Sequence, residues 1–199
     1  MRLTWLTDIH LDFITDPGNS RPSMENLDIF CSLISAHKPN ACLITGDISR
    51  APFLQSHLKE IERRLRVPIY FVLGNHDFWD SDINSVRNNM KLLCSSSKYL
   101  NYLSSIPYVM LDDRTALVGH DGWYDALYGE PYYSNYIMND WMRIADFARL
   151  KVVSNKMINL NAIIAIARQQ ANAAAEHISN GIKAVISQKK PKKIIIATH

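Results

Sequence analysis

The fold follows from one stretch of the sequence, Pro68-Ile-Tyr-Phe-Val-Leu-Gly-Asn-His-Asp77. Residues 69–73 are a short, unbroken run of apolar and aromatic side chains, which is typical of a buried strand in a parallel sheet. Gly74 permits a tight exit from that strand. Three polar side chains suited to metal and proton chemistry follow without a spacer: Asn75, His76 and Asp77. Because α/β proteins bind ligands at the carboxyl ends of their strands, these three are candidate functional residues.

Three other segments repeat this design of a strand that ends in polar residues. They are Leu3-Thr-Trp-Leu-Thr-Asp-Ile-His10, Ala41-Cys-Leu-Ile-Thr-Gly-Asp47 and, at the end of the sequence, Lys193-Ile-Ile-Ile-Ala-Thr-His199. Apolar residues at helical spacing predict helices over about 24–37 and 52–65, between the first three strands. Right-handed crossovers would make these strands parallel. We therefore expect four strands to deliver their polar residues to one point.

Three sequence blocks, in this order, resemble the calcineurin-like metallophosphoesterase family. They are Asp8/His10 in Asp-x-His, Gly46/Asp47/Arg50 in Gly-Asp-x-x-Arg, and Gly74/Asn75/His76/Asp77 in Gly-Asn-His-Asp. One block alone would be a weak signal, whereas three in order, each behind a strand, are a strong one. The resemblance covers residues 3–77 and the final strand. Between about 101 and 188 it is carried by fold expectation rather than by motifs.

The resemblance implies a metal-dependent phosphoesterase. Such an enzyme hydrolyses phosphomonoester or phosphodiester bonds with a metal-activated water at a two-metal site. Asp8 and His10 would hold the first ion, and Asn75 and His199 would hold the second. Asp47 would bridge both ions. The mixture of imidazole and oxygen ligands suits Mn²⁺, Fe²⁺/Fe³⁺ or Zn²⁺ better than Ca²⁺.

The resemblance also implies a catalytic set outside the metal ligands. His76 would donate a proton to the leaving oxygen or steady the phosphoryl group. Asp77 would orient His76, as partners of this kind fix imidazole tautomers. Arg50 has two equally weighted interpretations, contact with the substrate phosphate or pairing with a surface carboxylate. The alternative for all three blocks, that they are strand caps and solvated loop residues, is disfavoured because the blocks coincide.

Another histidine-containing stretch, Gly119-His120-Asp121-Gly122, is similar to the family's late Gly-His-x-His block. It departs from that block because Gly122 stands at the place of the second histidine. It also precedes the final Thr-His, whereas the family places the block after it. We interpret His120 as a strand-end residue near the pocket. Three further histidines are predicted to be surface or helix-end residues: His37, His57 and His177.

The second half of the chain predicts a second sheet. Residues 99–103, 108–111 and 115–119 are short alternating or apolar runs, which favour strands of a partly antiparallel sheet. Helices are predicted over about 80–94, 140–153 and 154–188. The fold class is therefore α/β, a layered sandwich of two mixed β-sheets flanked by helices, which the resemblance also implies.

A long irregular segment, residues 119–140, separates the second sheet from the last helices. It carries Trp123 and five tyrosines. Long loops of this kind are usually functional or poorly ordered. These aromatic residues either form a wall over the site or pack an insertion onto the domain, and we favour the second interpretation for most of them.

The family's Gly-His-x-His block should follow the last strand, but the sequence ends at His199. The resemblance then predicts a single metallophosphoesterase domain over residues 1–199 that is incomplete at its C-terminus. Part of the second sheet would be missing, and each metal would lose a histidine. An alternative function follows, that of a truncated, non-catalytic metallophosphoesterase-fold protein with weakened metal binding.

Composition narrows the function classes further. The 199 residues fit one domain, and 22 Lys and Arg against 19 Asp and Glu give no case for nucleic acid. Three unclustered cysteines favour reduced thiols in the cytosol. A strand near Met1 leaves no room for a signal peptide, and no apolar run is long enough to span a bilayer. We expect a cytoplasmic protein with a phosphate-ester substrate, whether phosphoprotein, nucleotide or small phosphodiester, and no membrane partner.

Overall fold

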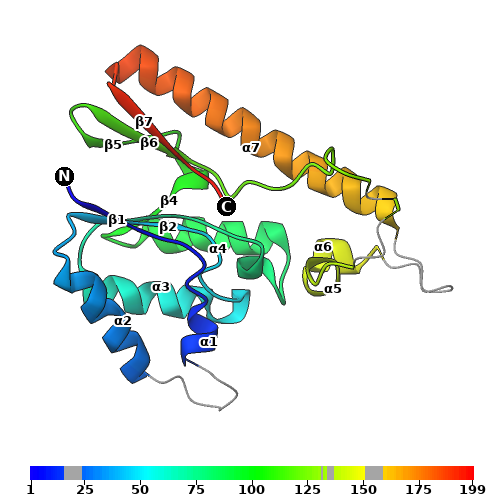
Figure 1. Ribbon diagram of the computed structural model, residues 1–199, viewed down its shortest axis with the longest axis horizontal. Helices are drawn as coiled ribbons and strands as arrows, with labels where there is room; N and C mark the ends of the chain where they lie inside the picture. The colour runs from blue at the N-terminus through cyan, green and yellow to red at the C-terminus, as the bar shows by residue number, and fades with distance from the viewer. Residues whose placement is uncertain (16–23, 131, 134–136, 151–158) are drawn as a thin grey trace.

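The computed structural model describes residues 1–15, 24–130, 132–133, 137–150 and 159–199. The chain is an α/β protein in which two β-sheets are stacked on each other with helices on the outer sides (Figure 1). The predicted fold class is confirmed. Among the described helices, none combines the length and the apolar character that a bilayer crossing requires.

The first sheet holds four parallel strands in the order β1-β2-β3-β4. Their bounds are β1 Leu3–Leu6, β2 Ala41–Thr45, β3 Ile69–Val72 and β4 Leu100–Tyr102. Every residue of β2 is buried, as expected for a strand between two neighbours and under two layers. Leu6 pairs with Ile44, which pairs with Phe71, so the first three strands end at the same edge.

Three helices cover the outer face of this sheet (Figure 1). Their bounds are α2 Met24–Ala36, α3 Ala51–Leu65 and α4 Ile83–Ser95, close to the predicted ranges. Each buries residues at helical spacing, for example Leu54, Leu58 and Ile61 of α3. Asp82 caps α4 by accepting a hydrogen bond of 2.9 Å from the Ser85 amide. Together these residues form the larger of the two apolar cores.

The second sheet holds three strands in the order β5-β6-β7. β5 (Val109–Asp112) is antiparallel to β6 (Thr115–Gly119), and β6 is parallel to β7 (Lys193–Ala197). A smaller apolar core lies between the two sheets, with Leu43 and Val72 from the first sheet and Leu117 and Ala197 from the second. The mixed pairing of this second sheet agrees with the prediction of a partly antiparallel sheet. The described strands of the first sheet are all parallel.

Two strand assignments from the sequence were wrong. The run at 99–103 was expected in the second sheet, but β4 pairs in parallel with β3, because α4 is a crossover that returns the chain beside β3. The strand ending at His199 was expected to be a central strand of its sheet. It pairs instead with β6 at one end of the second sheet, because α7 (Leu160–Lys189) packs on β6 and returns the chain there.

Several short elements complete the chain. They are α1 Leu11–Thr15, α5 Asp140–Arg143, α6 Ala145–Ala148 and two 3-10 turns at His76–Phe78 and Leu103–Ser105. The helix predicted over 140–153 is therefore two single turns in its described part. The predicted boundary between 153 and 154 lies outside the described residues. Residues 12–22 were expected to form a turn-rich loop, but α1 covers the first four of them, and 16–22 lie outside the described residues. The described part of 120–139 has no helix or strand, as predicted.

The helix α7 runs across the second sheet and comes close to it at Gly181 (Figure 1). A Cβ atom added at Gly181 would lie 2.2 Å from the carbonyl oxygen of Pro107 and 2.9 Å from Cγ1 of Val118. Glycine inside a helix is destabilising through its backbone entropy. At this position it permits the contact between helix and sheet, because any side chain would collide with backbone.

We predict that Gly181→Ala destabilises the protein. Alanine gains about 1 kcal/mol of helix propensity, but relieving a backbone collision costs about 1–3 kcal/mol or more, so the steric effect wins. Urea denaturation should show a lower midpoint. The control is Ser179→Ala on the exposed side of the same helix, which should leave the midpoint unchanged or raise it slightly. A stabilised Gly181→Ala protein would contradict the contact.

Candidate metal centre

The loops that follow β1 and β2 run side by side. The amide of Asp8 donates to the carbonyl of Gly46 at 3.2 Å, and the amide of His10 donates to the carbonyl of Asp47 at 2.9 Å. These hydrogen bonds continue the parallel pairing past the ends of the strands. They bring the first two sequence blocks into contact.

The backbone at three of these positions adopts a left-handed conformation. The φ angles are 51° at Asp8, 39° at His10 and 49° at Asp47. Residues other than glycine adopt this region rarely, at a cost of about 1–3 kcal/mol each. Such conformations persist only where the surroundings fix them, and they cluster at functional sites.

Two glycines leave room for side chains to converge. A Cβ at Gly74 would lie 2.2 Å from Oδ1 of Asp47 and 2.8 Å from Nε2 of His199. A Cβ at Gly46 would lie 2.4 Å from Nδ1 of His199. Any larger residue at either position would displace Asp47 or His199, so both glycines of the sequence blocks serve the site directly.

Asp47 lies at the centre of the arrangement. It is 4% exposed. Its Oδ2 is 3.7 Å from Nε2 of His10, and its Oδ1 is 3.5 Å from Nε2 of His199. Two groups of donor atoms, each within 4.8 Å, share this carboxylate: His10 with His76, and Asp8 with His199.

The donor geometry fits metal ions. Two ligands that each lie about 2.1 Å from one tetrahedral ion are about 3.4 Å apart, close to the histidine–carboxylate distances around Asp47. Nδ1 of His199 is 2.8 Å from the carbonyl of Thr45. A carbonyl only accepts hydrogen bonds, so Nδ1 carries a proton and Nε2 is the ring nitrogen that faces Asp47.

His76 lies against the same centre. Its ring stacks on Trp79, with 3.5 Å between centroids, and meets the ring of His10 at 4.7 Å. Its Nε2 is 4.0 Å from Oδ2 of Asp47. Burial lowers the pKa of His76, and the nearby Asp47 carboxylate opposes that shift. A neutral imidazole at this position can still donate one hydrogen bond.

Asp77 does not make the contact expected of it. Both of its oxygens accept from backbone amides: Oδ1 from Ile48 and Ser49, and Oδ2 from Gly74, each at 2.8 Å. It is completely buried. Burial raises the pKa of Asp77, and the three amide donors oppose that shift. Its hydrogen bonds therefore join the loops after β2 and β3, and none of those found among the described residues connects it to His76.

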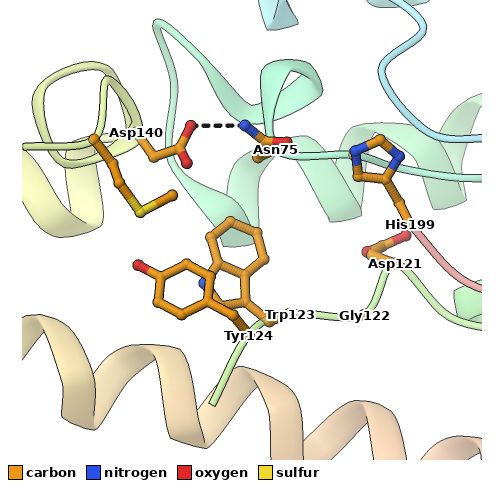
Figure 2. Close-up of a pocket in the computed structure, with 9 residues that line it drawn as sticks. Asn75, Asp121, Gly122, Trp123, Tyr124, Asp140 and His199 are labelled. Atoms are coloured by element: carbon orange, nitrogen blue, oxygen red, sulfur yellow. Dashed lines mark hydrogen bonds between the residues drawn. The ribbon is translucent and has the colours of Figure 1, made fainter. Parts of the chain in front are cut away.

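Asn75 and His199 line a cavity of about 230 Å³. Figure 2 shows Asn75 and Asp140 on one side of it, and Trp123 and Tyr124 facing them. Nδ2 of Asn75 donates to Oδ1 of Asp140 at 2.9 Å. No sequence pattern singles out Asp140, because it belongs to no block and begins a short helix. Its proximity to Asn75 arises only in the folded chain.

Asp121 is a second carboxylate that the sequence did not single out as functional. It is buried and accepts hydrogen bonds from the amide of Leu73 at 2.9 Å, Tyr102 at 2.6 Å and Arg87 at 2.9 Å. These contacts tie the end of β3 to the end of β6. Asp121 also lines the cavity, together with Gly122.

Arg50 is paired with carboxylates in the structure. Its Nε donates to Asp12 at 2.9 Å, and its Nη1 reaches Asp80 at 3.5 Å. Of the two interpretations offered by the sequence, carboxylate pairing is the one observed. Contact with a substrate phosphate stays a prediction.

Two histidines outside the blocks, His57 and His120, are buried, whereas His37 is exposed as predicted. His57 is 6% exposed, and its Nδ1 lies 2.9 Å from Oγ of Ser49, so its placement at the surface was wrong. His120 is buried beside His177, at 5.2 Å between rings. Burial lowers the pKa of His120 to about 4. It belongs to neither donor group found among the described residues.

Comparison with known proteins identifies the family. The model of the calcineurin-like phosphoesterase family matches residues 1–199. The chain belongs to the calcineurin-like phosphoesterase family. Members of this family are hydrolases that act on phosphate esters and generally bind divalent metals.

Two individual proteins are similar to this family member. One is a bovine (Bos taurus) transmembrane protein with a metallophosphoesterase domain, 31% identical over 88 residues, which are 43% of this chain and 18% of the relative. The other is the crystal structure of a phosphopantetheinyl hydrolase from Mycobacterium tuberculosis, with a TM-score of 0.60 and 12% identity. That match covers 100% of this chain and 67% of the hydrolase, and it supports the fold.

We predict that Asp77→Ala destabilises the protein strongly. The substitution leaves three buried amides without acceptors, and each costs about 1–3 kcal/mol, so the free energy of unfolding should fall by about 3 kcal/mol or more. Chemical denaturation measures this. The matched control is Asp113→Ala at an exposed turn, which should change stability little. Equal effects of the two substitutions would contradict the role assigned to Asp77.

Proposed function

We propose that this protein is a metal-dependent phosphoesterase with a two-metal site. The observation that supports this most directly is the shared position of Asp47. Its two carboxylate oxygens face different proposed ligands: Oδ2 is 3.7 Å from Nε2 of His10, and Oδ1 is 3.5 Å from Nε2 of His199, in whose donor group Asp8 also lies. A carboxylate in this position can be shared by two neighbouring ions.

The proposed ligands are Asp8, His10, Asp47, Asn75 and His199. Their mixture of imidazole nitrogen and oxygen suits Mn²⁺, Fe²⁺/Fe³⁺ or Zn²⁺. When bound, two such ions lower the pKa of a water molecule between them and stabilise charge on the phosphoryl oxygens. The protein fixes the donor atoms beforehand, through the left-handed backbone at Asp8 and Asp47 and the hydrogen bond from His199 to Thr45.

His76 is proposed to act on the substrate rather than on a metal. Its ring is held by Trp79 and His10 and faces Asp47 at the edge of the centre. From that position its N–H can reach the leaving oxygen or a phosphoryl oxygen. Arg50 is proposed as a secondary contact for the phosphate, which would require it to leave its pairing with Asp12 or Asp80.

The cavity beside Asn75 and His199 is proposed to hold the organic part of the ester. Its walls include the apolar surfaces of Trp123, Tyr124 and Met138. Apolar walls with a few polar groups are typical of sites for small organic groups. The three free cysteines are the basis for proposing a cytoplasmic location.

We predict that Asp47→Asn abolishes Mn²⁺-dependent hydrolysis and lowers the number of ions bound per chain. The substitution removes the only charge shared by both donor groups while keeping the side-chain size. Hydrolysis of p-nitrophenyl phosphate and bis(p-nitrophenyl) phosphate, with Mn²⁺ and with chelator, gives the activity, and calorimetry gives the stoichiometry. Asp113→Asn is the control. Unchanged metal content and activity would remove the two-metal proposal, and metal binding without hydrolysis in the unaltered protein would favour the non-catalytic alternative.

We predict that His76→Ala retains nearly normal Mn²⁺ binding but loses turnover. Proton donation by a positioned side chain contributes about 10²–10⁴-fold in rate, and kcat should fall by that order. His37→Ala, at an exposed site, should leave kcat unchanged. His76 also lies within reach of His10 and Asp47 as a possible ligand. A loss of bound metal in step with the loss of rate would therefore show that His76 binds metal.

A further inference from the structure

One oxygen of Asp140 holds two side chains of the loop that follows β3. Asp140 is 3% exposed and begins α5. Its Oδ1 accepts one hydrogen bond from Nδ2 of Asn75 at 2.9 Å and another from Nε1 of Trp79 at 2.7 Å. Both donors flank His76 in the sequence. A residue from a distant segment thus contacts the loop that carries the third sequence block.

The first hydrogen bond determines which way the amide of Asn75 faces. An ionised carboxylate only accepts hydrogen bonds, so it selects the nitrogen of the amide and turns the oxygen to the other side. In Figure 2 the amide oxygen of Asn75 points away from Asp140, toward the side on which His199 lies. Without Asp140 the two ends of the amide would be almost equivalent in size, and the donor nitrogen could take the place of the oxygen.

The second hydrogen bond fixes the ring that supports His76. Trp79 stacks on His76 with 3.5 Å between centroids. The guanidinium of Arg143, on the same short helix as Asp140, lies 4.5 Å from the Trp79 ring centroid and binds Asp80 at 2.8 and 2.9 Å. Asp140 and Arg143 together hold Trp79 in place, and the position of the His76 ring depends on that of Trp79.

We propose that Asp140 is a positioning residue of the metal centre. It presents the oxygen of Asn75 to the metal position and holds Trp79 against His76. This inference rests on the proposed function, because it takes Asn75 as a metal ligand. No sequence block contains Asp140, and its effect acts through Asn75 and Trp79 rather than by contact with the reacting atoms.

A merely structural role for Asp140 makes a different prediction. Nearby Asp146 serves as the comparison, because its Oδ2 accepts from the amide of Ile83 at 2.8 Å and fastens the same segment to the start of α4. Within the part of the chain that the structure describes, Asp146 makes no hydrogen bond to Asn75 or Trp79. If Asp140 only fastens the segment, the loss of either carboxylate should have the same consequence.

The experiment compares Asp140→Leu, Asp140→Asn and Asp146→Ala with the unaltered full chain. Leucine keeps the volume and removes both acceptors, whereas asparagine keeps an Oδ1 that can accept both hydrogen bonds. Mn²⁺ is titrated calorimetrically into chelator-treated protein, and kcat and KM are measured with p-nitrophenyl phosphate at saturating Mn²⁺. Thermal unfolding reports the stability of each variant.

Asp140→Leu should weaken one of the Mn²⁺ sites by about 10–100-fold, the usual effect of losing a partner of a metal ligand. It should also lower kcat at saturating Mn²⁺, through the displaced His76. Asp140→Asn should restore most of both, and Asp146→Ala should lower the melting temperature while leaving Mn²⁺ affinity unchanged. If Asp140→Leu does not fold, Asp140→Ser provides the same test, since its side chain is too short to reach both donors.

Three outcomes would overturn the inference. Normal Mn²⁺ affinity and kcat in Asp140→Leu, or in Asp140→Ser, would show that Asn75 and His76 do not depend on Asp140. An equal loss of affinity in Asp146→Ala would show that only the fastening of the segment matters. Absence of Mn²⁺ binding by the unaltered protein would remove both the proposed function and this inference. If the unaltered protein binds Mn²⁺ and hydrolyses the substrate, but the variants do not behave as expected, only the inference on Asp140 fails.

Discussion

The buried carboxylate of Asp77 is the constraint on which the proposed centre depends. It accepts hydrogen bonds from backbone amides of the loops after β2 and β3, and these bonds fix the distance between the two loops. That separation lets the amide of His76 donate to Oδ1 of Asp47 at 3.0 Å. A buried carboxylate is costly unless fully hydrogen-bonded, and here three amides meet that need. The strained backbone at Asp47 persists because these contacts leave the loop no alternative.

The second sheet is part of the site because β7 carries the final histidine. Its imidazole binds the carbonyl of Thr45 at the end of β2, which links the two sheets at their carboxyl edge. The position of β7 depends on β6, and β6 is packed under α7 at the close contact with Gly181. The proposed centre therefore lies where two sheets meet, and its geometry responds to packing between layers as well as to the loops.

The segment between β6 and α7 adds what the sequence blocks do not contain. Trp123 packs on Phe78 and Phe147 and so belongs to the core as well as to the cavity wall. The sequence offered two interpretations of Trp123, a wall over the site or packing onto the domain, and its contacts agree with both. Asp140 and Arg143 come from the same part of the chain and support the loop after β3. Proteins that share the blocks but differ in this segment would differ in the support of Asn75 and in the cavity.

The sequence by itself determined the α/β fold class, the first three parallel strands with the helices between them, and the convergence of Asp8, His10, Asp47 and His76. These follow from local patterns, since a buried apolar run specifies a strand and parallel strands end at one edge. Only the tertiary structure decided the sheet to which β4 and β7 belong, the partners of Asp77, the burial of His57 and the contact between Asp140 and Asn75. Each of these depends on groups distant in sequence being packed together, and no local pattern of apolar and polar residues encodes which distant group will be the neighbour.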